Sequence, residues 1–103
     1  MSPSDHRIHS IEELRSIVAP VAEKYGVDKV YLFGSVARGD CDESSDYDFC
    51  IVIPESFSLL KIGSFFYDLK EAVGSNIDLV WEDNLKPPLM EEVLHDRRLL
   101  YEA

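Results

Sequence analysis

The stretch from Asp46 to Ile53 constrains the fold most strongly, because polar and apolar residues alternate along it. In an extended chain, successive side chains point to opposite faces. One face would carry Tyr47, Phe49, Ile51 and Ile53, and the other Asp46, Asp48, Cys50 and Val52. A strand with one apolar face must bury that face, so this stretch predicts a sheet with other elements packed against it.

The flanking segments predict helices and further strands around this one. Apolar spacing predicts helices over residues 10–25, from Ser56 or Ser58 to residue 73, and from Pro88 to about Asp96. Ser10 and Glu13 form a capping-box pattern, Gly26 is a helix stop, and Pro20 predicts a kink or a split. Strands are expected over 27–33 and 76–81, and the end, RRLLYEA, could add a short extended piece.

We therefore expect an α/β (α+β) domain with a small mixed β-sheet of about three strands and helices packed on it. Residues 1–9 are expected to form a flexible tail, and residues 10–103 a single domain. Twenty acidic residues against ten basic ones give a net charge of −10. That charge argues against direct nucleic-acid binding, which needs cations on the phosphates, and favours cations or a basic protein as partners.

Cysteine content and hydropathy predict the compartment. Cys41 and Cys50 are too few for a disulfide scaffold and lack metal-ligand spacing. No apolar run approaches the ~20 residues that a membrane span needs. The prediction is a reduced, cytoplasmic protein without membrane contact.

Three features between Gly34 and Asp78 suggest chemistry. Gly34-Ser35 lies where a predicted strand gives way to a helical turn, which suits a phosphate but also describes an ordinary turn. Asp46 and Asp48 share one strand face, which suits Mg²⁺ or Mn²⁺ but also describes two solvated aspartates. Asp78 lies in the third strand and can join them if that strand lies beside the second; otherwise it is solvated at the strand end.

Arg38 has two interpretations that the sequence leaves open. It could offset the charge of a triphosphate, or it could form a structural ion pair with Asp46 or Asp48. The sequence assigns no role to Cys41, Cys50, Lys61, Arg97 or Arg98.

The combined motif resembles that of a known family. Gly34-Ser35, followed after ten residues by Asp46-x-Asp48, resembles the signature of the DNA polymerase beta-like nucleotidyltransferase superfamily. The Ala37-Arg38-Gly39 core resembles its minimal nucleotidyltransferase (MNT) branch. The similarity continues through I-D-L-V at 77–80 and covers roughly residues 10–103.

The resemblance implies a nucleotidyltransferase fold and a role for each matching residue. Gly34 and Ser35 would hold a nucleotide triphosphate, with Arg38 beside them. Asp46 and Asp48 would ligate two Mg²⁺ ions, or Mn²⁺, and Asp78 would complete one metal site and help to deprotonate the acceptor. Tyr47 and Phe49 replace the smaller aliphatic residues usual in the branch, which bears on packing and nucleotide fit.

The resemblance also implies a reaction and a partner. The chain would be the antitoxin of a HEPN/MNT toxin–antitoxin pair, transferring AMP from ATP to a tyrosine of the HEPN toxin with release of pyrophosphate. Two alternatives remain: a non-catalytic antitoxin that masks its partner, and a small-molecule (antibiotic) nucleotidyltransferase. The sequence does not specify base preference, acceptor residue or oligomeric state.

Overall fold

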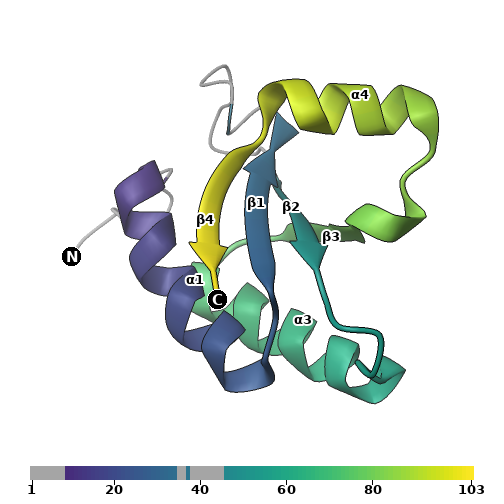
Figure 1. The fold of residues 1–103 in the computed structure, drawn as a ribbon. Helices are drawn as coiled ribbons and strands as arrows, with labels where there is room; N and C mark the ends of the chain where they lie inside the picture. The colour runs from purple at the N-terminus through teal and green to yellow at the C-terminus, as the bar shows by residue number, and fades with distance from the viewer. Residues whose placement is uncertain (1–8, 35–36, 38–45) are drawn as a thin grey trace.

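The computed structural model describes residues 9–34, 37 and 46–103 (Figure 1). Two of the expected site residues, Ser35 and Arg38, therefore lie outside the described residues. The elements along the chain are α1 (Ile11–Tyr25), β1 (Lys29–Phe33), β2 (Tyr47–Val52), α3 (Leu59–Val73), β3 (Ile77–Trp81), the 3-10 helix η2 (Glu82–Asn84), α4 (Pro87–Asp96) and β4 (Arg98–Glu102).

The four strands form one mixed sheet in the order β3-β2-β1-β4. β1 is antiparallel to both β2 and β4, whereas β2 and β3 are parallel and are joined through α3. The expectation of about three strands is corrected to four, because the C-terminal segment pairs with β1 along its length, with Glu102 opposite Lys29. The sequence pattern alone did not show that this short segment had a partner strand.

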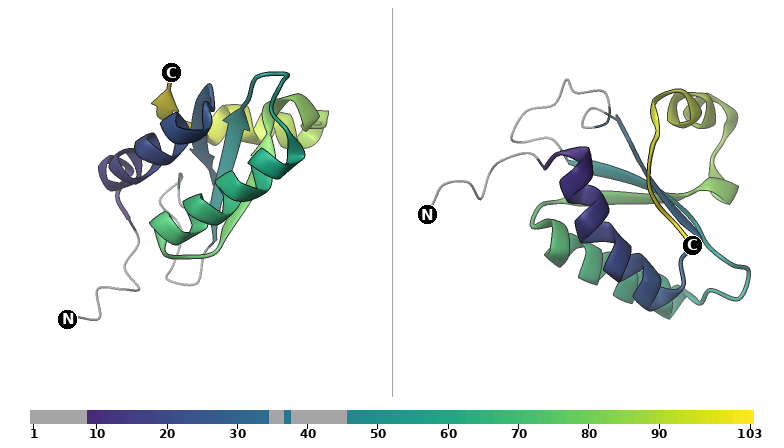
Figure 2. Two further views of the ribbon diagram at one scale, coloured as in Figure 1. Left: turned by 90° about the horizontal axis from the view of Figure 1, so that it is seen from below. Right: turned by 60° about the vertical axis from the view of Figure 1, so that its left-hand side comes forward.

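The sheet lies between two layers of helix (Figure 2). α1 and α3 pack together on one face and bury the main core, which includes Leu14, Val18, Phe49, Phe65 and Leu69. A smaller cluster on the opposite face joins Phe33 and Cys50 of the sheet to Val93 of α4. None of the described helices combines the length and apolar character that a membrane crossing requires.

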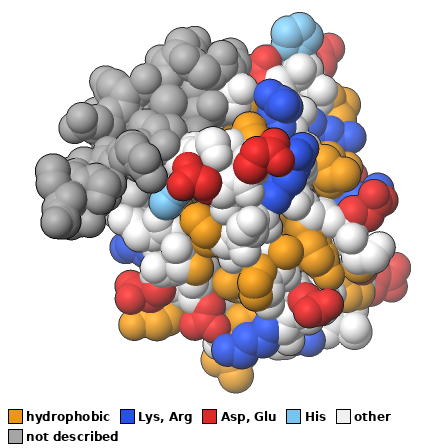
Figure 3. Space-filling view, turned by 90° about the vertical axis from the view of Figure 1, so that its left-hand side faces the viewer, with side chains coloured by type: hydrophobic (Ala, Val, Ile, Leu, Met, Phe, Trp, Pro, Cys, Tyr) orange, Lys and Arg blue, Asp and Glu red, His pale blue; other side chains and the backbone are white. Residues whose placement is uncertain are grey.

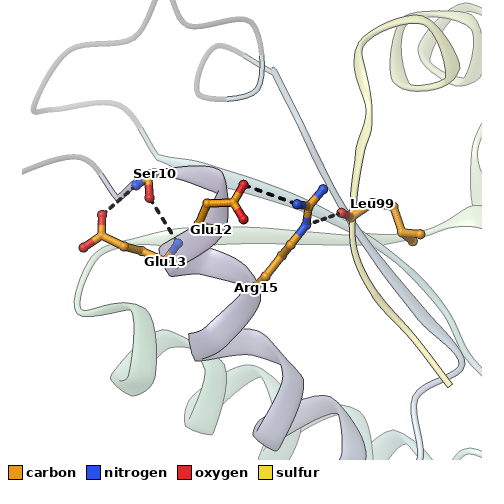
Figure 4. Close-up of polar contacts among 5 residues, drawn as sticks. All are labelled: Ser10, Glu12, Glu13, Arg15 and Leu99. Atoms are coloured by element: carbon orange, nitrogen blue, oxygen red, sulfur yellow. Dashed lines mark hydrogen bonds and ion pairs between the residues drawn. The ribbon is translucent and has the colours of Figure 1, made fainter.

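The helix boundaries follow local hydrogen bonding. The side chain of Ser10 accepts from the Glu13 N–H at 3.1 Å, and the Glu13 carboxylate accepts from the Ser10 N–H at 2.8 Å (Figure 4). This capping box and the left-handed Gly26 at the other end confirm the predicted limits of α1. Pro20 does not split the helix, because the buried side chains of Val18 and Ala22 on either side hold the turn against the core.

Candidate active site

Asp48 and Asp78 lie side by side on neighbouring strands. The parallel register of β2 and β3 places Asp48 opposite Asp78, with strands about 4.8 Å apart. Residues opposite each other in a parallel pair present their side chains to the same face, which here is the face of Cys50 and Val80 that α4 partly covers. The condition set by the sequence, that the third strand lie beside the second, is met.

Asp46 directly precedes β2 and is exposed. Asp78 is also exposed, and Asp48 is half-buried. Within residues 9–34, 37 and 46–103, no three acidic, histidine or cysteine side chains are grouped closely enough to hold a metal ion as they stand. The chemistry of the donors nevertheless fits Mg²⁺ or Mn²⁺, since all three supply carboxylate oxygens and two remain open to solvent.

Gly34 brings the end of β1 into contact with Asp48. It follows Phe33, which is opposite Asp48 in the antiparallel register, and its φ is +79°. A Cβ atom at this position would overlap the Asp48 carboxylate. Glycine is therefore required twice at this bend, once for the left-handed backbone and once for the space that the carboxylate takes. The pattern had predicted the turn, and the structure adds the contact.

A second polar group lies on the same face of the sheet and was not assigned from the sequence. Arg97, which follows α4, lies over the ring of Tyr31 at 4.0 Å and donates to the Glu82 carboxylate at 2.6 Å. These contacts connect the end of α4 to η2 and to β1 of the sheet. No spacing in the sequence could reveal the group, since it joins residues from three distant segments.

Cys50 lies beside this group but is not a nucleophile. It is fully buried, and burial, reinforced by the negative charge of Glu82, raises the pKa of its thiol to about 11. The thiol is therefore protonated at neutral pH and acts as a small apolar side chain.

The structure therefore defines an α/β domain in which carboxylates on neighbouring strands lie beside a glycine bend. Residues 16–103 match the sequence model described as polymerase beta, nucleotidyltransferase. Since that match covers most of the chain, the protein belongs to this nucleotidyltransferase family, as its sequence had indicated.

Named relatives narrow the comparison. The chain is 33% identical over 91 residues to protein adenylyltransferase MntA of Thermococcus cleftensis, covering 84% of this chain and 92% of the relative. A solved minimal nucleotidyltransferase structure is 33% identical, with a TM-score of 0.75, and the match covers 89% of this chain and 97% of that one. These similarities confirm the predicted MNT branch and the nucleotidyltransferase fold.

A third match is more distant. It is a chain of a tri-AMPylated Shewanella oneidensis HEPN toxin in complex with MNT antitoxin. The identity is 17% and the TM-score 0.68, and the match covers 91% of this chain and 74% of that one. At this identity the similarity shows the shared fold.

Proposed function

We propose that the chain is a metal-dependent protein adenylyltransferase, the antitoxin of a toxin–antitoxin pair, which transfers AMP from ATP to a tyrosine of a HEPN-domain toxin. The observation that carries the proposal is the register that sets Asp48 beside Asp78, with Gly34 against Asp48. The name of the Thermococcus relative supports protein adenylylation, and the Shewanella complex supports a HEPN partner.

The reaction joins the acceptor oxygen to the α-phosphorus of ATP. The tyrosine hydroxyl oxygen attacks that phosphorus, the bond to the oxygen bridging to the β-phosphate breaks, and pyrophosphate leaves. Asp78, whose carboxylate is exposed, would accept the hydroxyl proton. Divalent cations held by Asp46, Asp48 and Asp78 would neutralise the charge on the phosphates.

Gly34 has a separate part in this proposal. A residue without a side chain lets the backbone at the end of β1 approach the phosphates closely, and it leaves the Asp48 carboxylate in place. Ser35 and Arg38, which lie outside the described residues, would add a hydroxyl and a positive charge there. In this proposal the HEPN-domain toxin supplies the acceptor, in an ATP-containing, cytoplasmic setting.

The direct test is the mass of the partner after reaction. The purified chain is incubated with ATP, Mg²⁺ and a HEPN-domain protein encoded in the same genome. We expect one or more adenylyl groups on a tyrosine, and rates lowered about a hundredfold or more by Asp48→Asn or Asp78→Asn. Asp28→Asn is the matched control, because Asp28 is exposed just before β1, at the other end of the sheet.

Two outcomes would count against the proposal that the chain acts as an adenylyltransferase. An unmodified, correctly folded partner would argue against AMP transfer. Full neutralisation of toxicity by Asp48→Asn, at equal expression, would favour the alternative in which the antitoxin only masks its partner.

A further inference from the structure

The two edges of the sheet differ in whether they can accept another strand. At the β4 edge, the Arg15 side chain donates to the Leu99 carbonyl at 3.2 Å (Figure 4). The Arg15 guanidinium also forms an ion pair with the Glu12 carboxylate at 3.4 Å. α1 lies beside this edge, and the surface there mixes charged and apolar side chains (Figure 3). Charged side chains at an edge, and a helix that covers it, are among the ways in which proteins block strand addition.

At the other edge, β3 directs backbone groups outward. The Tyr47 N–H donates to the Asn76 carbonyl at 3.1 Å, so Asn76 faces β2. Because alternate residues of a parallel strand direct both backbone groups to opposite sides, those of Ile77, Leu79 and Trp81 face away from β2. Among the described residues, no other strand pairs with this outer side, and Trp81 is also the N-terminal cap of η2.

An apolar pocket wraps around the same edge. Its volume is about 200 Å³, and it is lined by Leu79, Val80, Trp81, Leu85 and Leu89. Leu79 and Trp81 belong to the face covered by α1 and α3, whereas Val80 belongs to the carboxylate face. Leu89 of α4 is 39% exposed, so the pocket is open to an incoming apolar side chain.

Around the edge, among the described residues, the exposed acidic side chains outnumber the exposed Lys86. Asp78 on β3 and Asp83 in the following η2 are both exposed. Nearby Arg97 already pairs with Glu82, so it does not neutralise them. In a chain with a net charge of −10, this edge favours a basic segment.

We infer that the outer edge of β3 binds an extended, basic segment of the partner protein as an added strand, and that this segment carries the acceptor hydroxyl. The inference rests on the proposed function. An added strand would put one side chain next to Asp78, in line with Asp48, and an apolar side chain two residues along, at the pocket. The edge would thus align the acceptor with the carboxylates through backbone pairing.

Hydrogen exchange tests the backbone pairing without chemistry. Amide exchange in the chain is followed by NMR with and without the HEPN-domain protein, in the absence of ATP. The amides of Ile77, Leu79 and Trp81 should become protected in the complex. Those of Asp78 and Val80 face β2, so they should be protected in both states. A complex that leaves the three outward amides unchanged, or no complex at all, would overturn the inference.

Two leucines of α4 test the pocket. Leu89→Lys should weaken partner binding about tenfold or more, because it fills the pocket with a charge. Leu94→Lys on the same helix, at a residue 50% exposed and outside the pocket lining, should not. Equal losses from both variants would contradict docking at this pocket, provided that both remain folded by circular dichroism.

The inference and the proposed function fail separately. If the β3 amides become protected but no AMP is transferred when ATP and Mg²⁺ are added, the proposed function fails and the docking edge stands. If AMP is transferred without protection of the β3 amides, the proposed activity is supported and binding of the partner at the β3 edge is rejected.

Discussion

Gly34 shows how a single residue joins a backbone requirement to a chemical one. Its φ of +79° is shared by Gly74 at the end of α3, but among the described glycines only Gly34 lies where a Cβ atom would meet another group, the Asp48 carboxylate. At Gly74 nothing lies within 4 Å. The two glycines therefore separate the cost of the backbone conformation from the cost of displacing the carboxylate.

We predict that Gly74→Ala lowers the free energy of unfolding by about 1 kcal/mol, because an L-residue strains a left-handed backbone. Gly34→Ala should lower it further, because its methyl group also overlaps the Asp48 carboxylate. Only Gly34→Ala should abolish AMP transfer, since its methyl group forces the Asp48 carboxylate to move. Urea unfolding and the partner-mass assay measure the two effects. Equal activity in both variants would show that the position of Asp48 is unimportant.

Tyr47 anchors the start of β2, next to Asp46 and Asp48. Its ring is buried and stacks on Phe49, and its hydroxyl accepts from the His9 N–H at 2.9 Å. His9 also donates from its ring Nε2 to the Val73 carbonyl at 2.8 Å. The last residue of the segment expected to be a tail is thus fixed to the end of α3, and the large ring at position 47 fills core space.

Tyr47→Phe should keep the ring packing and lose the hydroxyl, leaving the half-buried His9 N–H without this acceptor. We expect a loss of about 1 kcal/mol in the free energy of unfolding. Tyr67→Phe, at a residue 63% exposed, is the matched control and should be neutral within about 0.5 kcal/mol. Equal unfolding midpoints for the wild type and Tyr47→Phe would show that the hydrogen bond adds nothing.

At the scale of elements, the sequence predicted what depends on local pattern. The alternation in β2, the capping box at Ser10 and the serine cap of α3 at Ser58 are all present, because each depends on residues a few positions apart. β4 was uncertain because a short segment becomes a strand only by pairing with β1. The Arg97–Glu82 pair and the β3 pocket could not be predicted, since they join distant segments.

The same limit applies to the candidate site. The sequence identified the three aspartates and Gly34, and could state that Asp78 would join Asp48 only if β2 and β3 were neighbours. Sheet order decides that question, and sheet order depends on where α3 crosses and packs. Ligation by Asp46, Asp48 and Asp78 remains a prediction.

α1 and α3 are joined at their outer side by one polar group. Asp68 accepts from the Tyr25 hydroxyl at 2.6 Å and from the Lys24 ammonium at 3.1 Å. The Tyr25 hydrogen bond, and then Lys24, hold the pKa of Asp68 below its usual range. A lowered pKa in the folded state means that this carboxylate stabilises the fold above its unfolded pKa, and that the contribution is lost as the pH falls through the folded value.

Tyr25→Phe should therefore make the free energy of unfolding depend less on pH in the acid range. The difference in free energy of unfolding between wild type and variant should be largest near neutral pH and shrink as the pH drops below about 4. Urea titrations at a series of pH values give this difference. A gap that stays constant down to acid pH would mean that Tyr25 acts through packing on Phe65 rather than through Asp68.

For the whole molecule, a net charge of −10 acts on association more than on the fold. Rising salt should slow association with the HEPN-domain protein roughly tenfold between about 0.01 and 0.5 M, because the screening length shortens from about 30 Å to a few ångströms. The dissociation rate should change much less. Stopped-flow mixing over a salt series measures both rates, and an association rate independent of salt would contradict electrostatic steering.

Two charge reversals test which end of the sheet attracts the partner electrostatically. Asp83→Lys and Asp28→Lys give the same net charge, but Asp83 lies in η2 beside the β3 edge and Asp28 lies just before β1, at the other end of the sheet. Both should slow association at low salt, and Asp83→Lys should slow it more, since it also opposes a basic segment at the docking edge. If Asp28→Lys has the larger effect, the partner approaches from the opposite end of the sheet, away from the carboxylates.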